Sequence, residues 1–136
     1  MAPETWCYFF RVINTLYNEV HRGFTSGRAE RNRVIFMAKT FELGRVVATR
    51  AVWELMIENE AFNTFVSGCL SRYILYDWGD TCKEDWESNN FAVENGERVL
   101  AVYNRPLDIE SGFEEHLWII TEWDRSATTL LFPSDY

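Results

Sequence analysis

The chain has 136 residues, 47% of them hydrophobic and 16% aromatic, which is enough apolar material for the core of one domain. No apolar run approaches the roughly 18 residues that cross a bilayer, and acidic Glu4 stands where a secretory signal has a basic region, so we expect a cytoplasmic protein that uses no membrane. Cys7, Cys69 and Cys82 are odd in number and far apart, which argues against a disulfide framework and a paired-cysteine zinc site.

The net charge of −8 is distributed unevenly along the chain. Residues 1–50 carry eight Lys and Arg against four Asp and Glu, a net +4, whereas residues 51–136 carry five against seventeen, a net −12. An acidic body disfavours binding to phosphate backbones and favours basic surfaces, including the nucleic-acid-binding grooves of other proteins. Simple solubility explains the same surplus. Arg28, Arg31 and Arg33 lie on a predicted loop, where arginines usually face solvent, so we do not expect direct nucleic-acid binding.

The first predicted element is an amphipathic helix from about Pro3 to Arg22. Apolar side chains recur there at intervals of three and four residues, and Gly23 suits the end of the helix. So wide an apolar stripe has to be buried. The domain itself, a homodimer contact and another partner are the three candidate surfaces for it.

Further helices are expected in the middle of the chain. Thr49 is a candidate N-cap for the first of them, and Asn59 is one for the second, whose apolar stripe places Cys69 in the core. Residues 81–84 match a capping box, in which a threonine and a glutamate satisfy each other's backbone amides at the start of a third helix. Asn95-Gly96 is expected to end that helix.

The C-terminal third predicts strands that form a meander, near 98–104, 115–122 and 127–132. If residues 123–126 form the last loop, Thr121 faces Thr128 and Ile119 faces Leu130. Both faces of the sheet are then largely apolar, so one packs under helices and the other needs further helices, the N-terminal helix or a second subunit. The predicted fold is therefore α+β, with a small antiparallel sheet of about three to four strands and three to four helices, including the N-terminal one.

Two polar segments are candidate binding sites. One is the turn at 77–80 with the acidic helix start that follows it, and the other is the tip of the last hairpin. Turns held by their own side chains explain the same residues without a ligand. Neither histidine has a second histidine or a cysteine at ligand spacing, so the sequence predicts no metal site, no cofactor and no catalytic residue. The candidate partner-binding residues are Asp77, Trp78, Asp80, Glu84, Asp85, Glu122, Asp124 and Arg125.

Two other functions fit the same residues. A small metal-dependent hydrolase or nucleotide-processing enzyme would use Asp77, Asp80, Glu122 and Asp124 around a divalent ion, if folding brought the two pairs together. A self-associating structural or regulatory subunit would instead use the apolar face of the sheet. These alternatives differ in what they require of the fold, because the first needs carboxylates that converge and the second needs an uncovered apolar surface.

Short motifs across roughly the last two-thirds of the chain match those of a known family. They are Gly44 to Thr49, Asp77 to Asp80, Glu84-Asp85, Asn90, Gly96, Trp118 to Glu122, Asp124 to Ser126, Thr128-Thr129 and Pro133 to Tyr136. With them, the region from about Phe41 onwards resembles a family of short bacterial proteins encoded on plasmids, prophages and other mobile elements, often labelled plasmid-related or, by gene neighbourhood, type I restriction subunit. The resemblance implies a family core at 37–136 and an added helix and linker at 1–36, within a single domain at 1–136.

The resemblance carries no established reaction, and this chain departs from it at two positions. Family members commonly have a histidine in place of Tyr73 and a glycine in place of Tyr76. If that histidine is a general base, this chain is inactive. Together with the acidic body, these features predict a non-enzymatic accessory protein of a mobile element. Its expected partner is a host defence nuclease, of CRISPR or restriction type, whose basic groove the acidic turns would occupy in place of nucleic acid.

Overall fold

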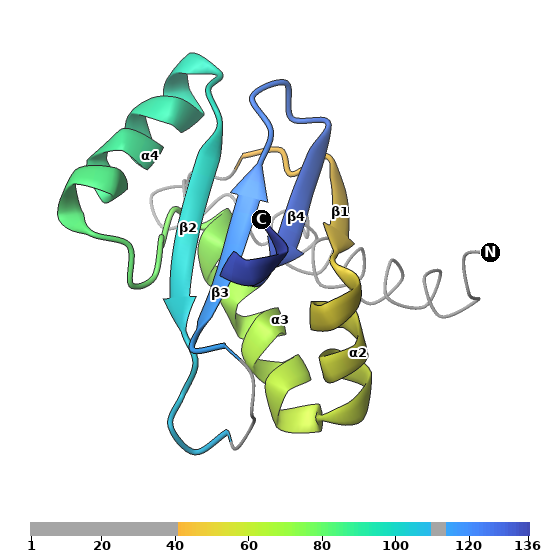
Figure 1. Cartoon of the computed structure of the whole chain (residues 1–136). Coiled ribbons are helices and arrows are strands. Elements are labelled where there is room, and N and C mark those ends of the chain that lie inside the picture. Colours follow the sequence, from red (N-terminus) through yellow and green to blue (C-terminus); the bar gives the residue numbers. More distant parts are fainter. Residues whose placement is uncertain (1–40, 110–113) are drawn as a thin grey trace, which may run out of the picture. The chain divides into compact units, whose positions relative to one another are not determined.

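The computed structural model describes residues 41–109 and 114–136 of the chain (Figure 1). The predicted extension at 1–36, with its helix and its arginine loop, lies outside these ranges. No helix within them combines the length and the apolar character that crossing a bilayer requires.

The described elements form an α+β fold, as the sequence predicts. Three α-helices and a four-stranded sheet are present in the two described ranges, and the sheet has the order β1-β4-β3-β2. The elements in chain order are β1 (Arg45–Ala48), α2 (Arg50–Glu58), α3 (Glu60–Ile74), α4 (Lys83–Asn95), β2 (Val99–Asn104), β3 (His116–Thr121), β4 (Ala127–Leu131) and the 3-10 helix η2 (Pro133–Asp135).

The predicted meander and its register are confirmed. Strands β2, β3 and β4 are antiparallel neighbours, and Thr121 pairs with Thr128 while Ile119 pairs with Leu130. Strand β1, however, pairs with β4 in parallel, so the sheet is mixed and the prediction of a wholly antiparallel sheet is wrong at this edge. A parallel partner is reached through a long crossover, and a four-residue strand contains no local indication of its partner's direction.

Helices α2 and α3 cover one face of the sheet (Figure 1). The side chains that β2, β3 and β4 direct to this face are fully buried, and α3 adds Cys69 and Tyr73 to the same core. Burial raises the pKa of the Cys69 thiol to about 12, because the thiolate loses its hydration. The predicted core position of Cys69 is therefore confirmed.

The helix ends agree with the sequence at two positions and differ at two others. Asn59 caps α3 by accepting a 3.0 Å hydrogen bond from the Phe62 amide, and Gly96 ends α4 in the left-handed conformation, with φ 67°. Thr49 occupies the N-cap position of α2, but its hydroxyl donates to Asp135 instead of capping the helix. The predicted capping box at 81–84 is wrong, because Cys82 is the N-cap of α4 and the Thr81 hydroxyl binds a turn carbonyl.

The C-terminal residues cover part of the second sheet face. Helix η2 contacts β3, and the Tyr136 ring lies 5.8 Å from the Trp118 ring in an edge-on arrangement. The guanidinium of Arg98 lies 5.4 Å from the centre of the same tyrosine ring. Ile120 and Leu131, which point to this face, are buried. The C-terminal residues thus cover part of the face that was predicted to need another helix or a second subunit.

Candidate functional site

The first candidate segment, the turn at 77–80, is held by the carboxylate of Asp77. Arg72 donates two hydrogen bonds to it, of 2.8 and 3.1 Å, and the Gly79 amide donates a third of 3.0 Å. The pKa of Asp77 is lowered, chiefly by the hydrogen bonding from Arg72. The Asp77 carboxylate is therefore already hydrogen-bonded within the fold, although its side chain remains partly exposed.

Asp80 and Thr81 bind the backbone of the edge strand β2. The Asp80 carboxylate accepts from the Asn104 amide at 2.7 Å, and the Asp80 amide donates to the Val102 carbonyl at 2.7 Å. The Val102 amide donates to the Thr81 hydroxyl at 2.9 Å. Unpaired backbone groups on an edge strand promote association with other chains, and here the turn satisfies them.

Helix α4 completes this edge cover with an asparagine. The Asn89 side chain donates to the Leu100 carbonyl at 2.7 Å and accepts from the Leu100 amide at 3.2 Å. Asn89 is buried, so a polar residue on α4 replaces the neighbouring strand that β2 lacks on this side. The turn and α4 are thus fixed to β2 as one unit.

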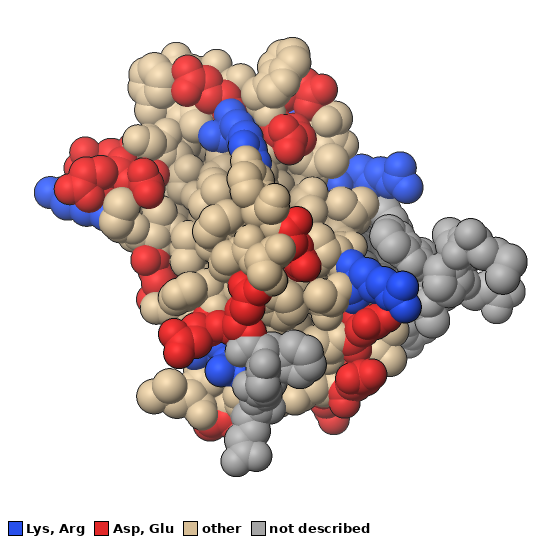
Figure 2. Space-filling model, viewed as in Figure 1, with Lys and Arg blue, Asp and Glu red and all other residues tan. Residues whose placement is uncertain are grey.

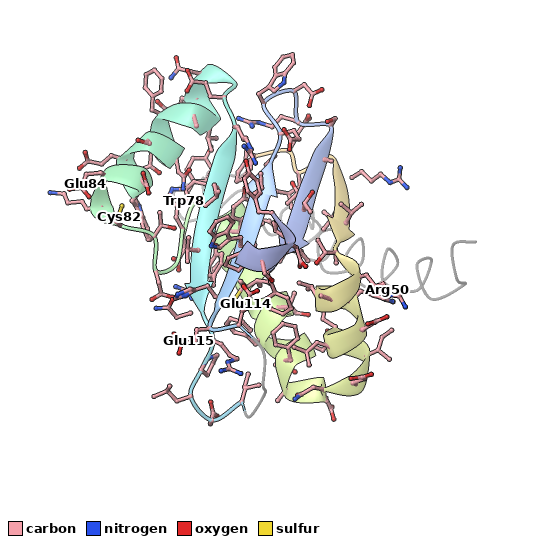
Figure 3. The ribbon with its side chains drawn as sticks, viewed as in Figure 1. Arg50, Trp78, Cys82, Glu84, Glu114 and Glu115 are labelled. Atoms are coloured by element: carbon pink, nitrogen blue, oxygen red, sulfur yellow. The ribbon has the colours of Figure 1, made fainter. Side chains whose placement is uncertain are left out.

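Trp78 is a core residue and not an exposed contact. Its exposed fraction is 0%, and its indole nitrogen donates to Asn90 at 2.9 Å. Its ring lies 5.2 Å from that of Tyr73 and 5.7 Å from that of Phe41. Figure 3 shows Trp78 beside β2, whereas Glu84 points away from the sheet. Trp78 anchors the turn, and its ring is not available to a partner.

The second candidate segment, the hairpin tip, is tied to the end of α4 by Arg125. The guanidinium donates to the Glu97 carbonyl at 2.7 Å, to the Ala92 carbonyl at 3.0 Å and to the Glu122 carbonyl at 3.0 Å. A cation at the C-terminal end of a helix is also favourable for the helix dipole. Arg125 therefore joins two elements of the fold and, like Trp78, is a structural residue.

The tip has a defined backbone conformation. Asp124 accepts a 3.0 Å hydrogen bond from the Ser126 amide, and bonding from Ser126 lowers the pKa of this carboxyl group. Arg125 has a positive φ of 59°. Gly44 packs so closely against the tip that a Cβ there would overlap the Arg125 carbonyl oxygen. The tip is consequently a rigid feature that presents Trp123 and Asp124 to solvent.

The two acidic segments lie at opposite ends of the sheet. Asn104, which Asp80 binds, pairs with His116 at the start of β3, whereas Glu122 follows the last residue of that strand. The five residue steps between these ends correspond to about 17 Å. The four carboxylates of the hydrolase alternative do not converge as it requires. Within the two described ranges, no three His, Cys, Asp or Glu side chains are grouped to hold a metal ion.

A buried chain of hydroxyl groups joins α3 to the sheet. The Tyr73 hydroxyl lies 2.7 Å from that of Thr121, which lies 2.8 Å from that of Thr128, and the last donates to the Leu43 carbonyl at 2.7 Å. Because Thr128 donates to a carbonyl, Thr121 must donate to Thr128, and Tyr73 must donate to Thr121. Burial raises the pKa of Tyr73, which keeps this donor protonated. The threonine pair follows from the predicted register, but the tyrosine donor does not.

Helix α4 connects the two candidate segments. The turn at 77–80 leads towards its first residue, and the hairpin tip binds the Ala92 carbonyl in its last turn. Its 13 residues span about 20 Å. Figure 2 shows acidic side chains gathered over its first turns, at the left of the view. The exposed carboxylates along α4 and directly after it are Glu84, Asp85, Glu87, Glu94 and Glu97. The first two were predicted as partner-binding residues, and the other three were not, although all five can be read from the sequence.

Comparison of the chain with protein-family models, with curated proteins and with solved structures found no match. The described surface is therefore the structural basis for a function.

Proposed function

We propose that this protein is a non-enzymatic accessory protein of a mobile genetic element that binds and inhibits a host defence nuclease, of CRISPR or restriction type. The acidic surface along α4 is the observation that carries the proposal. The described residues contain seventeen Asp and Glu against seven Lys and Arg. Seventeen acidic residues less seven basic ones leave these residues a net charge of −10.

The proposed mechanism is competition for a basic groove. A DNA strand places one phosphate every ~3.4 Å along the helix axis, so the roughly 20 Å length of α4 matches about six phosphates. Carboxylates on a rigid helix present negative charge, as phosphates do, to a groove lined by Lys and Arg. Unlike nucleic acid, the helix contains no phosphodiester bond for the nuclease to cleave. Such binding weakens as salt increases, because exposed charges are screened.

The resemblance to proteins of plasmids and prophages supports the mobile-element origin. Defence nucleases act on invading DNA in the cytoplasm, so the proposal locates this chain there. A homodimer, which the sequence offers as one way to cover the apolar surfaces, is a separate proposal. Sedimentation that shows a monomer at every concentration would remove it.

The test is phage plating on three isogenic hosts, with a CRISPR system only, a restriction system only, or neither. Expression of the chain should raise plating on one of the first two hosts and leave the third unchanged. A double variant, Glu87→Gln with Glu94→Gln, should lose much of this effect. Its matched control is Glu58→Gln with Glu60→Gln, which removes the same charge from exposed positions on α2 and α3.

The purified protein should also inhibit cleavage by the protected host's nuclease in vitro. Retention of that nuclease by the tagged protein after nucleic-acid digestion would establish direct contact between the two proteins. Unchanged plating on all three hosts would refute the proposed function. Equal losses in the two double variants would show that net charge matters and that the α4 surface does not.

A further inference from the structure

Helix α4 exposes an aromatic side chain on its outward side. It buries only Asn89 and Ala92, and Phe91 has an exposed fraction of 57%. Glu87, Phe91 and Glu94 are separated by intervals of four and three, so they share one side of the helix. An exposed phenylalanine side chain adds little to the stability of the fold. A single exposed apolar residue is nevertheless common on protein surfaces. Phe91 becomes a candidate contact residue because a second exposed aromatic lies at the same end of the fold.

That second aromatic is Trp123 at the hairpin tip, with an exposed fraction of 66%. Two residues later, Arg125 binds the carbonyl of Ala92, the residue next to Phe91, and the carbonyl of Glu97 just beyond α4. These bonds hold the tip against the end of the helix that bears Phe91. The two aromatics therefore belong to one end of one rigid unit.

Each of the two aromatics is followed in the sequence by exposed carboxylates. Glu94 and Glu97 follow Phe91 on and after α4, and Asp124 follows Trp123 on the tip; all three are exposed. Binding energy in protein interfaces concentrates in a few aromatic anchors encircled by polar side chains, and tryptophan is among the residues most enriched there. A rigid unit also loses little conformational entropy on binding.

We infer that Phe91 and Trp123 anchor the partner, which binds the C-terminal end of α4 and the hairpin tip through an apolar pocket bordered by Lys and Arg. The inference rests on the proposed function and locates its interface. The partner is a protein, because an acidic rim repels nucleic acid. It differs from this chain, because the described surface of a second copy is acidic as well and would bring carboxylates against carboxylates. The N-terminal end of α4 contributes charge around this centre.

The inference is tested by combining Phe91→Ala with Trp123→Ala. The matched control combines Leu75→Ala with Leu107→Ala, two exposed apolar residues outside the proposed interface. The aromatic double variant should bind the protected host's nuclease at least about 30-fold more weakly than the parent, the range of a hot-spot loss. The leucine double variant should bind like the parent. Thermal unfolding of both variants should match the parent, because all four side chains are exposed.

Photo-crosslinking locates the contact independently of affinity. The probe is p-benzoylphenylalanine incorporated at position 91, 123 or 107 and irradiated in the phage-tested host. Crosslinks to the nuclease from 91 and 123 but not from 107 support the inference. Crosslinks from 107 alone, or full binding by the aromatic double variant, would overturn it while the proposed function stands. If expression protects no host, the proposed function fails, and the inference fails with it.

Discussion

The turn at 77–80 and the outward side of α4 are both rich in carboxylates and aromatics, yet the fold uses them in opposite ways. In the turn, Asp77 binds Arg72, Asp80 binds a backbone amide of β2, and Trp78 is buried. On α4, Glu87 and Phe91 face solvent. Residue type alone therefore does not identify a binding surface. The partners that each side chain already has within the fold decide what remains for another molecule.

The sharpest contrast is between two tryptophans, Trp78 in the turn and Trp123 on the hairpin tip that binds the end of α4. Trp78→Ala should lower the free energy of unfolding by about 3–5 kcal/mol, because it removes a buried ring from a packed aromatic cluster. Trp123→Ala should change it by no more than about 0.5 kcal/mol, since the ring is exposed. Urea denaturation followed by circular dichroism measures both. Equal destabilisation by the two variants would contradict the division between a structural turn and a binding surface.

The buried hydroxyl chain next to Trp78 provides the second test. Thr121→Val leaves the Tyr73 hydroxyl without its acceptor and should cost about 1–3 kcal/mol of stability. Tyr73→Phe removes the donor hydroxyl itself and leaves no buried O–H group without an acceptor. It should therefore lower the stability by less than Thr121→Val does. The same denaturation experiment ranks the two variants. The reverse order would mean that the direction of the hydrogen bonds differs from the one deduced.

Tyr76, at the start of the turn, allows a finer comparison. Its φ is 64°, a left-handed conformation that costs a side-chain-bearing residue about 1–2 kcal/mol, and its ring lies 5.5 Å from that of Trp78. Tyr76→Ala and Tyr76→Gly both remove the ring, but only glycine also removes the backbone strain. We expect the glycine variant to be more stable than the alanine variant by about 1 kcal/mol. Equal stabilities would show that the backbone relaxes out of this conformation.

The smallest expected effect is the pH dependence that comes from Asp77. Its pKa in the folded state lies below the ordinary value of 3.8, chiefly through its hydrogen bonds with Arg72. The pair therefore adds stability above that value, and the contribution is lost as the pH falls through the folded-state pKa. Because both side chains are substantially exposed, the contribution should be about 0.2–1 kcal/mol.

The free energy of unfolding, measured with denaturant from neutral to acidic pH, checks this contribution. The measurement is made on the parent, on both single variants and on the double variant. Asp77→Asn and Arg72→Met should each remove it, and the two changes together should remove no more of it than either one alone. Additive effects would mean that the two side chains act separately.

Local patterns account for the elements that the sequence predicted correctly. The alternation of side chains in the last two strands, with the short loop between them, sets Thr121 opposite Thr128. Asn59 and Gly96 act at helix ends through backbone groups only a few residues away. The capping box failed because Thr81 had a competing role that a local pattern cannot reveal, as the bond partner of β2.

The α+β class, the meander with its register and the core position of Cys69 could be predicted from the residues alone, because these features depend on periodicity and on near neighbours. The parallel pairing of β1, the bond from Asp80 to β2 across 24 residues and the bond from Arg125 to α4 across 33 could not be predicted in this way. Such bonds depend on which elements the chain brings together. For the same reason, the exposed end of α4 with Phe91 and Trp123 became visible as one surface only in the folded protein.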